Sequence, residues 1–222
     1  MPAIPVKTGS QSLVRALPFA VFIAFVAAQS LAGGASPLWW AARDASATLA
    51  LVLLLPRYTE LRDAPRPTAL QACAAILAGV AVFAAWTRLD QGWNSLALHD
   101  GFDPTGERAG LAGPLLALRL FALAVTVPLM EEIFWRSFLL RWIDSPNFLA
   151  ADPRAASFRA IALVTALFAA EHSQWLAGLL AGAAYTAVYV RTRNILLTTL
   201  SHAITNLLLG IWILSTGSWR FW

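Results

Sequence analysis

The feature that most constrains this chain is a series of apolar runs, most of them about as long as a membrane-crossing helix. A hydrocarbon core about 30 Å thick requires roughly 20 apolar residues in a helix. The 222-residue chain is 59% hydrophobic and 13% charged, whereas a soluble domain carries about 25% charged residues. We therefore expect an all-α, polytopic membrane bundle. We count about seven spans, over approximate residues 13–31, 38–55, 69–86, 111–140, 158–172, 176–190 and 194–214.

The chain divides near residue 110 into two parts. Residues 1–110 contain the first three spans and the longest polar stretch, residues 87–110, which we expect to form an external loop. Residues 111–222 contain the remaining spans and most of the ionisable residues that fall inside apolar runs. The runs at 158–172 and 176–190 are short and only a few residues apart.

The distribution of basic residues predicts how the chain is oriented. The net charge is +4, but the basic residues are scattered through short loops without a basic face, so we exclude nucleic acid as a partner. If the N-terminus is cytoplasmic, the inner segments hold Lys7, Arg15, Arg57, Arg62, Arg66, Arg136, Arg141, Arg154, Arg159, Arg191 and Arg193. The outer segments hold Arg43, Arg88, Arg108 and Arg220. The positive-inside rule favours this orientation, with an external C-terminus, and the small size and compact loops indicate a bacterial inner membrane.

Six ionisable residues fall within or at the ends of the apolar runs, where an ionised side chain costs about 2.5–3.5 kcal/mol. They are Glu131, Glu132, Arg136, Glu171, His172 and His202. Such residues persist in spans by pairing, by facing a cavity or by taking part in chemistry. Glu132 and Arg136 are four residues apart and share a helix face. The adjacent Glu131 and Glu132 project about 100° apart, so we expect one to face a cavity and the other to pair with Arg136.

Three of these residues lie at similar depths on separate helices. At about 1.5 Å per residue, Glu131 lies roughly 15 Å from the cytoplasmic end of its span, His172 roughly 20 Å and His202 roughly 12 Å. We therefore expect one cluster that opens towards the cytoplasm, with Glu132 and Arg136 behind it. Asn206 lies one helical turn from His202 and shares its face. Glu171 adjoins His172 but is expected to point elsewhere on its helix.

Three short motifs carry these residues in a fixed order. They are EEIFWR at residues 131–136, FAAEH at 168–172 and HAITN at 202–206. They resemble the EExxxR, FxxxH and HxxxN motifs of the CAAX-protease and bacteriocin-processing (CPBP) family. In size and arrangement the chain resembles the bacterial CAAX-protease-related members that act with exosortases. The resemblance implies a membrane-embedded peptidase with its catalytic helical core in residues 111–222.

The resemblance also implies a role for each motif residue. Glu131 would be the general base, and His172 would help it to hold and deprotonate a water molecule. His202 and Asn206 would donate hydrogen bonds to the oxyanion that forms at the scissile carbonyl. The catalytic set would therefore come from three different helices.

The same resemblance assigns supporting residues and bears on the cofactor. Glu132 and Arg136 would orient Glu131 and His172, and Phe168 would support the site. Two histidines and a carboxylate also match the ligand chemistry of catalytic zinc sites. Because the chain has no His-Glu-x-x-His helix, and the resemblance favours a glutamate-type protease without metal, we expect no cofactor.

The resemblance further implies the kind of partner. The substrate would be a peptide or lipidated protein in the lipid bilayer, cut near its C-terminus, and a protein-sorting partner would present it. Two other classes of protein stay open. A proton-coupled transporter would use the acidic and histidine side chains as a relay, but it predicts inverted repeats, and none is visible in the sequence. A non-catalytic membrane immunity or scaffold protein would retain the motifs by descent.

Overall fold

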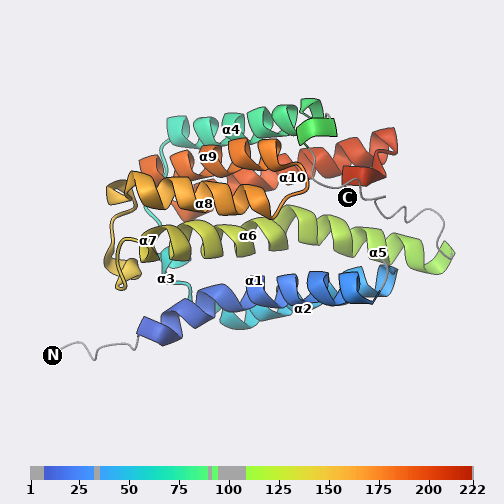
Figure 1. The fold of residues 1–222 in the computed structure, drawn as a ribbon, viewed down its shortest axis with the longest axis horizontal. Helices are drawn as coiled ribbons and strands as arrows, with labels where there is room; N and C mark the ends of the chain where they lie inside the picture. The colour runs from blue at the N-terminus through green and yellow to red at the C-terminus, as the bar shows by residue number, and fades with distance from the viewer. Residues whose placement is uncertain (1–7, 33–35, 90–91, 95–108, 222) are drawn as a thin grey trace.

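The computed structural model describes residues 8–32, 36–89, 92–94 and 109–221. Within these segments every regular element is helical (Figure 1). The predicted all-α class is therefore confirmed. Most of the expected external loop at 87–110 lies outside the described residues.

Five helical segments of the described chain are long and apolar enough to cross a membrane, by length and composition. They are Gly9–Leu31, Pro37–Arg57, Ala69–Arg88, Leu111–Trp142 and Ile195–Thr216. They comprise α1 (Thr8–Leu31), α2 (Pro37–Leu54) with the 3-10 turn after it, α4 (Ala69–Arg88), a long central helix and α10 (Ile195–Thr216). A multi-pass membrane protein follows from these segments.

The predicted count of about seven spans is not confirmed, because the two short apolar runs form helices outside these five. Helix α8 (Phe158–Ala170) has 13 residues, which is about 20 Å of helix. Helix α9 (Trp175–Thr192) has 18 residues. The two pack against each other, and α9 also packs against α4 and α10. Both therefore belong to the bundle, joined by a turn over residues 171–174.

The long central helix separates two groups of helices (Figure 1). Helices α1 and α2 pack together on one side, and α4, α9 and α10 pack together on the other. Helices α4 and α10 approach each other closely at Gly79, where a Cβ atom would collide with the carbonyl oxygen of Ser201. Thr205 Oγ1 donates to the carbonyl oxygen of Gly79 at 2.8 Å. A residue without a side chain therefore lets these two helices meet backbone to backbone.

The central helix is not a regular α-helix along its length. It begins as α5 (Ala109–Phe121), becomes a π-helix over Ala122–Thr126 and returns to α6 (Val127–Glu132). A second π-helix covers Ile133–Leu139 before α7 (Leu140–Trp142). Short π-helical segments within α-helices are frequent at functional sites. The two acidic residues of the first motif lie at the end of the six-residue α6.

A buried polar cluster closes the end of the bundle where α1 begins. The Arg15 guanidinium donates to Glu60 through Nε at 2.8 Å and through Nη2 at 2.6 Å, and α3 (Thr59–Arg62) carries Glu60. Ser137 donates to the same carboxylate at 2.6 Å, and Arg141 donates to Ser137 Oγ at 2.8 Å. Arg15 is fully buried and Arg141 nearly so. The sequence analysis included both residues among the basic charges that orient the chain in the membrane, whereas the structure places both side chains inside the bundle.

Candidate active site

A cavity of about 340 Å³ lies between α1, the central helix and the carboxyl-terminal helices. Its polar lining residues are Arg119, Glu131, Glu171, His172, Ser173, Gln174, Tyr185, His202, Asn206 and Arg220. Arg220 lies beyond the end of α10, and Arg119 lies near the start of the central helix. The cavity therefore extends towards the end of the bundle where α10 finishes. The sequence analysis expected an opening towards the other end, where α1 begins, whereas these lining residues extend the other way.

Glu131 and Glu132 diverge as their adjacency predicted. Glu131 lines the cavity and is 6% exposed, and its Oε2 atom is buried with no hydrogen-bond partner among the described residues. Glu132 is fully buried and accepts a hydrogen bond from Nη1 of Arg136 at 3.0 Å. The π-helical turn after Glu132 does not disrupt this pair. Glu131 thus lies on the cavity side, whereas the Glu132–Arg136 ion pair is fully buried.

Glu132 has a second partner that the sequence did not predict. Its Oε1 atom also lies 2.9 Å from Nδ1 of His202, on α10. Glu132 and Arg136 were expected to orient Glu131 and His172. The hydrogen bonds of Glu132 instead go to Arg136 and His202. Glu132 instead fixes the orientation of His202. Arg136 donates further to the carbonyl oxygen of Gly182 at 3.3 Å, which links the central helix to α9.

His172 lies just past the end of α8, in the turn that leads into α9. Its Nδ1 atom is 2.7 Å from the carbonyl oxygen of Phe168. A carbonyl can only accept, so Nδ1 carries the hydrogen and Nε2 has a lone pair in the neutral ring. The edge of Trp86 packs on the imidazole, with ring centroids 5.2 Å apart. The ring is therefore held in one orientation with a basic nitrogen available.

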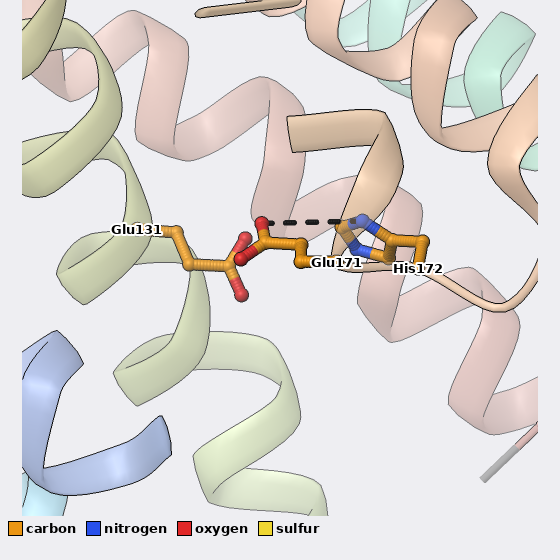
Figure 2. Close-up of side chains that lie close together, drawn as sticks. All are labelled: Glu131, Glu171 and His172. Atoms are coloured by element: carbon orange, nitrogen blue, oxygen red, sulfur yellow. Dashed lines mark ion pairs between the residues drawn. The ribbon is translucent and has the colours of Figure 1, made fainter. Parts of the chain in front are cut away.

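The direction of Glu171 differs from the sequence expectation. Figure 2 shows its carboxylate pointing towards that of Glu131, beside His172. One ligand atom from each of these three residues lies within 4.8 Å of the others. Trp135 Nε1 donates to Glu171 Oε1 at 3.0 Å. The expectation failed because α8 ends at Ala170, so helical spacing no longer decides where residue 171 points.

His202 and Asn206 line the same cavity from one face of α10. The His202 ring stacks on Tyr185, with centroids 4.6 Å apart and planes 20° apart. Asn206 Nδ2 donates one hydrogen bond to the carbonyl oxygen of Leu123, in the first π-helix, at 3.0 Å. Because the amide nitrogen has two hydrogens, a second N–H remains for another acceptor.

Two aromatic residues complete the surroundings of this site. Phe168 is fully buried, and the Arg136 guanidinium lies 4.3 Å from the centre of its ring. Tyr185 donates to Thr205 Oγ1 at 2.8 Å. Phe168 was expected to support the site, and it contacts both Arg136 and His172. Tyr185 was missed, because a tyrosine in an apolar helix gives no signal that distinguishes it from a core residue.

The comparison with known families matches this part of the chain. The model for "Type II CAAX prenyl endopeptidase Rce1-like" matches residues 113–208. Through this segment the chain is similar to the CAAX-protease family. The matched residues run from α5 into α10 and include all three motifs. A search of curated proteins and a search of solved structures each returned no match.

This similarity, together with the apolar helices, supports a membrane endopeptidase as the class of protein. The matched segment carries Glu131, His172, His202 and Asn206 together with their ion pair and aromatic neighbours. Helices α1, α2 and α4 lie outside the match. Helices α1 and α4 still contribute cavity walls, since Phe19, on α1, and Trp86, on α4, line the cavity.

The zinc alternative can be tested against the residues that the structure brings together. Catalytic zinc sites use sets such as three histidines, or two histidines and a glutamate. The compact group in the described chain is Glu131, Glu171 and His172, which contains one histidine and two acids. His202, the second histidine that a zinc set would need, is bonded to Glu132 instead. The group that lies close enough to hold a metal ion therefore differs from the two-histidine set that the sequence raised, and the absence of a cofactor stays a prediction.

Proposed function

We propose that this chain is a glutamate-type intramembrane endopeptidase. It hydrolyses a peptide bond near the C-terminus of a membrane-associated peptide or lipidated protein. One observation carries the proposal: Glu131, His172, His202 and Asn206 come from three separate parts of the chain and line one cavity. The family match at residues 113–208 supports the same class of reaction.

Water activation falls to Glu131 and His172. Glu131 lines the cavity, and no described residue donates to its Oε2 atom, so its carboxylate is available to accept a hydrogen from a water molecule there. His172 Nε2 has a lone pair, because Nδ1 donates to Phe168. A positioned base of this kind typically contributes about 10²–10⁴ in rate. The water would be held between the carboxylate and the imidazole as it attacks the scissile carbonyl.

Stabilisation of the oxyanion falls to His202 and Asn206. Asn206 has one N–H beyond the one that it donates to Leu123. His202 donates from Nε2 when both ring nitrogens carry hydrogen, and the Glu132 carboxylate beside Nδ1 stabilises that cation. Each oxyanion donor typically contributes about 10²–10³ in rate. The Glu132–Arg136 pair thereby supports the oxyanion side of the site.

The membrane setting of the proposal follows from the charges and from the direction of the cavity. With the protein in a bacterial inner membrane and the N-terminus cytoplasmic, the cavity would open at the external end, where α10 finishes. Substrates would then be cut on that side. A protein-sorting partner that delivers the substrate remains part of the proposal.

The experiment is cleavage of a reporter by the purified protein in detergent or vesicles. The probe is a quenched fluorescent peptide that ends in a CAAX sequence, offered with and without a farnesyl group on its cysteine. Glu131→Gln and His172→Ala should each lower kcat by about 10²-fold or more. Gly113→Ala is the matched control, because a Cβ there meets no atom within 4 Å. Full activity of Glu131→Gln would overturn the proposal.

Two further outcomes assign the chain to other classes. Loss of cleavage on adding a metal chelator, with recovery on adding zinc, would contradict the metal-free mechanism. No cleavage of either form of the probe by the wild-type protein would favour the non-catalytic scaffold. A proton-coupled transporter would instead show uptake into vesicles that depends on a pH gradient.

A further inference from the structure

Glu171 is a third acidic side chain in the cavity, outside the motif positions. In FxxxH only the phenylalanine and the histidine are specified, and Glu171 occupies one of the open positions. Its side chain is 17% exposed and lines the same cavity as Glu131. Figure 2 shows the two carboxylates directed towards each other from α6 and the α8–α9 turn. A side chain placed this way can reach the peptide bond that a water molecule activated by Glu131 attacks.

Two carboxylates this close repel each other when both are charged. One ligand atom of each lies within 4.8 Å of the other and of His172. Like charges at such a distance cause one carboxyl to keep its proton. Arg136 donates hydrogen bonds to Glu132 and to the carbonyl oxygen of Gly182. The Glu131–Glu171 pair therefore retains a proton between its two members.

The Trp135 indole distinguishes the two oxygens of Glu171. Its Nε1–H donates to Oε1 at 3.0 Å, so that oxygen is an acceptor. The proton is then carried by Oε2. The indole is held by the aromatic rings of Phe134 and Phe168, at centroid distances of 4.7 and 6.1 Å. Glu171 is thus fixed in direction, whereas no described residue donates to Glu131 Oε2.

We infer that Glu171 is the general acid of the reaction, which protonates the leaving amine while Glu131 acts as the base. This inference rests on the proposed peptidase function. Glu131 accepts a proton from water as the water oxygen bonds to the carbonyl carbon. The carbon–nitrogen bond then breaks, its electron pair stays on nitrogen, and Glu171 Oε2 gives its proton to that nitrogen. Transfer of the proton from Glu131 to Glu171 restores both groups, so one water molecule is consumed.

The test compares two leaving groups in the same enzyme. One probe is the quenched CAAX peptide, and the other is its thioester analogue, in which sulfur replaces the scissile nitrogen. A thiol has a pKa of about 8.5, so the thioester's sulfur leaves as a thiolate without receiving a proton. The nitrogen of the peptide must receive a proton before it leaves. Glu171→Gln should lower kcat on the peptide by about 10²-fold or more, and on the thioester by less than about threefold. Trp135→Phe should show the same selectivity with a smaller loss.

The variants separate failure of the inference from failure of the proposed function. Glu131→Gln should lose activity on both probes, because both need an activated water. If Glu131→Gln cleaves the peptide normally, the peptidase proposal fails. If Glu131→Gln is inactive but Glu171→Gln cleaves the peptide normally, or loses both probes equally, Glu171 is not the acid. The thermal unfolding temperature of Glu171→Gln should match that of the wild-type protein. Glu171→Asp, if folded, provides a second variant in which the losses of kcat on the peptide and on the thioester can be compared.

Discussion

His202 Nδ1 lies 2.9 Å from Glu132 Oε1, which joins α10 to the central helix through one buried oxygen. The same oxygen accepts from Arg136 at 3.0 Å. All three side chains are buried. The orientation of a proposed oxyanion donor therefore depends on an ion pair within the central helix, 70 residues away in sequence.

Replacing Glu132 by glutamine should reduce both activity and stability. Glutamine keeps the shape but removes the charge that Arg136 and His202 share. We expect kcat to fall by roughly tenfold, as for other groups that orient a functional histidine. An uncompensated buried Arg136 should lower the free energy of unfolding by about 3 kcal/mol. Asp63→Asn, in the exposed Arg62–Asp63 pair, is the control and should change stability by less than about 0.5 kcal/mol. Equal effects of the two variants would contradict this account.

Tyr185→Phe should separate the hydroxyl of this residue from its ring. The hydroxyl donates to Thr205, and its loss should lower the free energy of unfolding by about 1 kcal/mol. The ring stays stacked on His202, so kcat should remain within a few-fold of wild type. Tyr185→Ala removes the stack and should lower kcat much further. A kcat for Tyr185→Phe as low as that of Tyr185→Ala would show that the hydroxyl, not the ring, holds His202.

Gly79→Ala should destabilise the bundle at the contact between α4 and α10. The new Cβ would collide with the carbonyl oxygen of Ser201 and lie 3.1 Å from Cβ of Ile204. Overpacking of this kind typically costs about 1–3 kcal/mol. Gly113→Ala meets nothing within 4 Å and should be neutral or stabilising by up to about 1 kcal/mol. Thermal unfolding of both variants in the same detergent measures the difference, and a neutral Gly79→Ala would show that the two helices separate easily.

The Glu60 cluster should make the stability of the bundle depend on pH. Burial alone would raise the pKa of the Glu60 carboxyl, but hydrogen bonds from Arg15 and Ser137 and the charge of Arg15 outweigh it, so the pKa is lowered. A lowered folded-state pKa contributes stability above the unfolded value of about 4.3, and that stability is lost as pH falls through the folded pKa.

Unfolding measured from about pH 7 to about pH 3 tests this sign. The wild-type protein should lose stability towards acid more steeply than Glu60→Gln, which has no carboxyl to protonate at that position. Glu60→Gln should be less stable at neutral pH, because Arg15 remains buried. Parallel pH curves for the two proteins would show that Glu60 does not contribute the effect.

Helical periodicity in the sequence was sufficient to predict how the site residues within one helix lie relative to one another. The divergence of Glu131 and Glu132, the Glu132–Arg136 pair and the shared face of His202 and Asn206 all follow from positions within helices. Spacing of one helical turn fixes such relationships before any tertiary contact is known.

The parts that sequence reasoning missed lie where helices end or where helices meet. Glu171 points into the cavity because α8 stops one residue earlier. The bond from Glu132 to His202 depends on how α10 packs on the central helix, and no local pattern encodes that packing. The depth argument expected an opening towards the end where α1 begins, whereas the cavity lining reaches Arg220, beyond the end of α10.

The two π-helical segments on either side of α6 set the rotation of Glu131 about the helix axis. Each residue of an α-helix turns the chain by about 100°. Deleting a single residue from Ala122–Thr126 would therefore turn α6 relative to α5 far enough to move Glu131 out of the cavity. Insertions and deletions in this stretch would abolish the alignment of the site while leaving every motif residue unchanged in identity. A homologue with an intact EExxxR motif but a different number of residues in the preceding π-helical segment would direct the first glutamate of that motif away from the cavity.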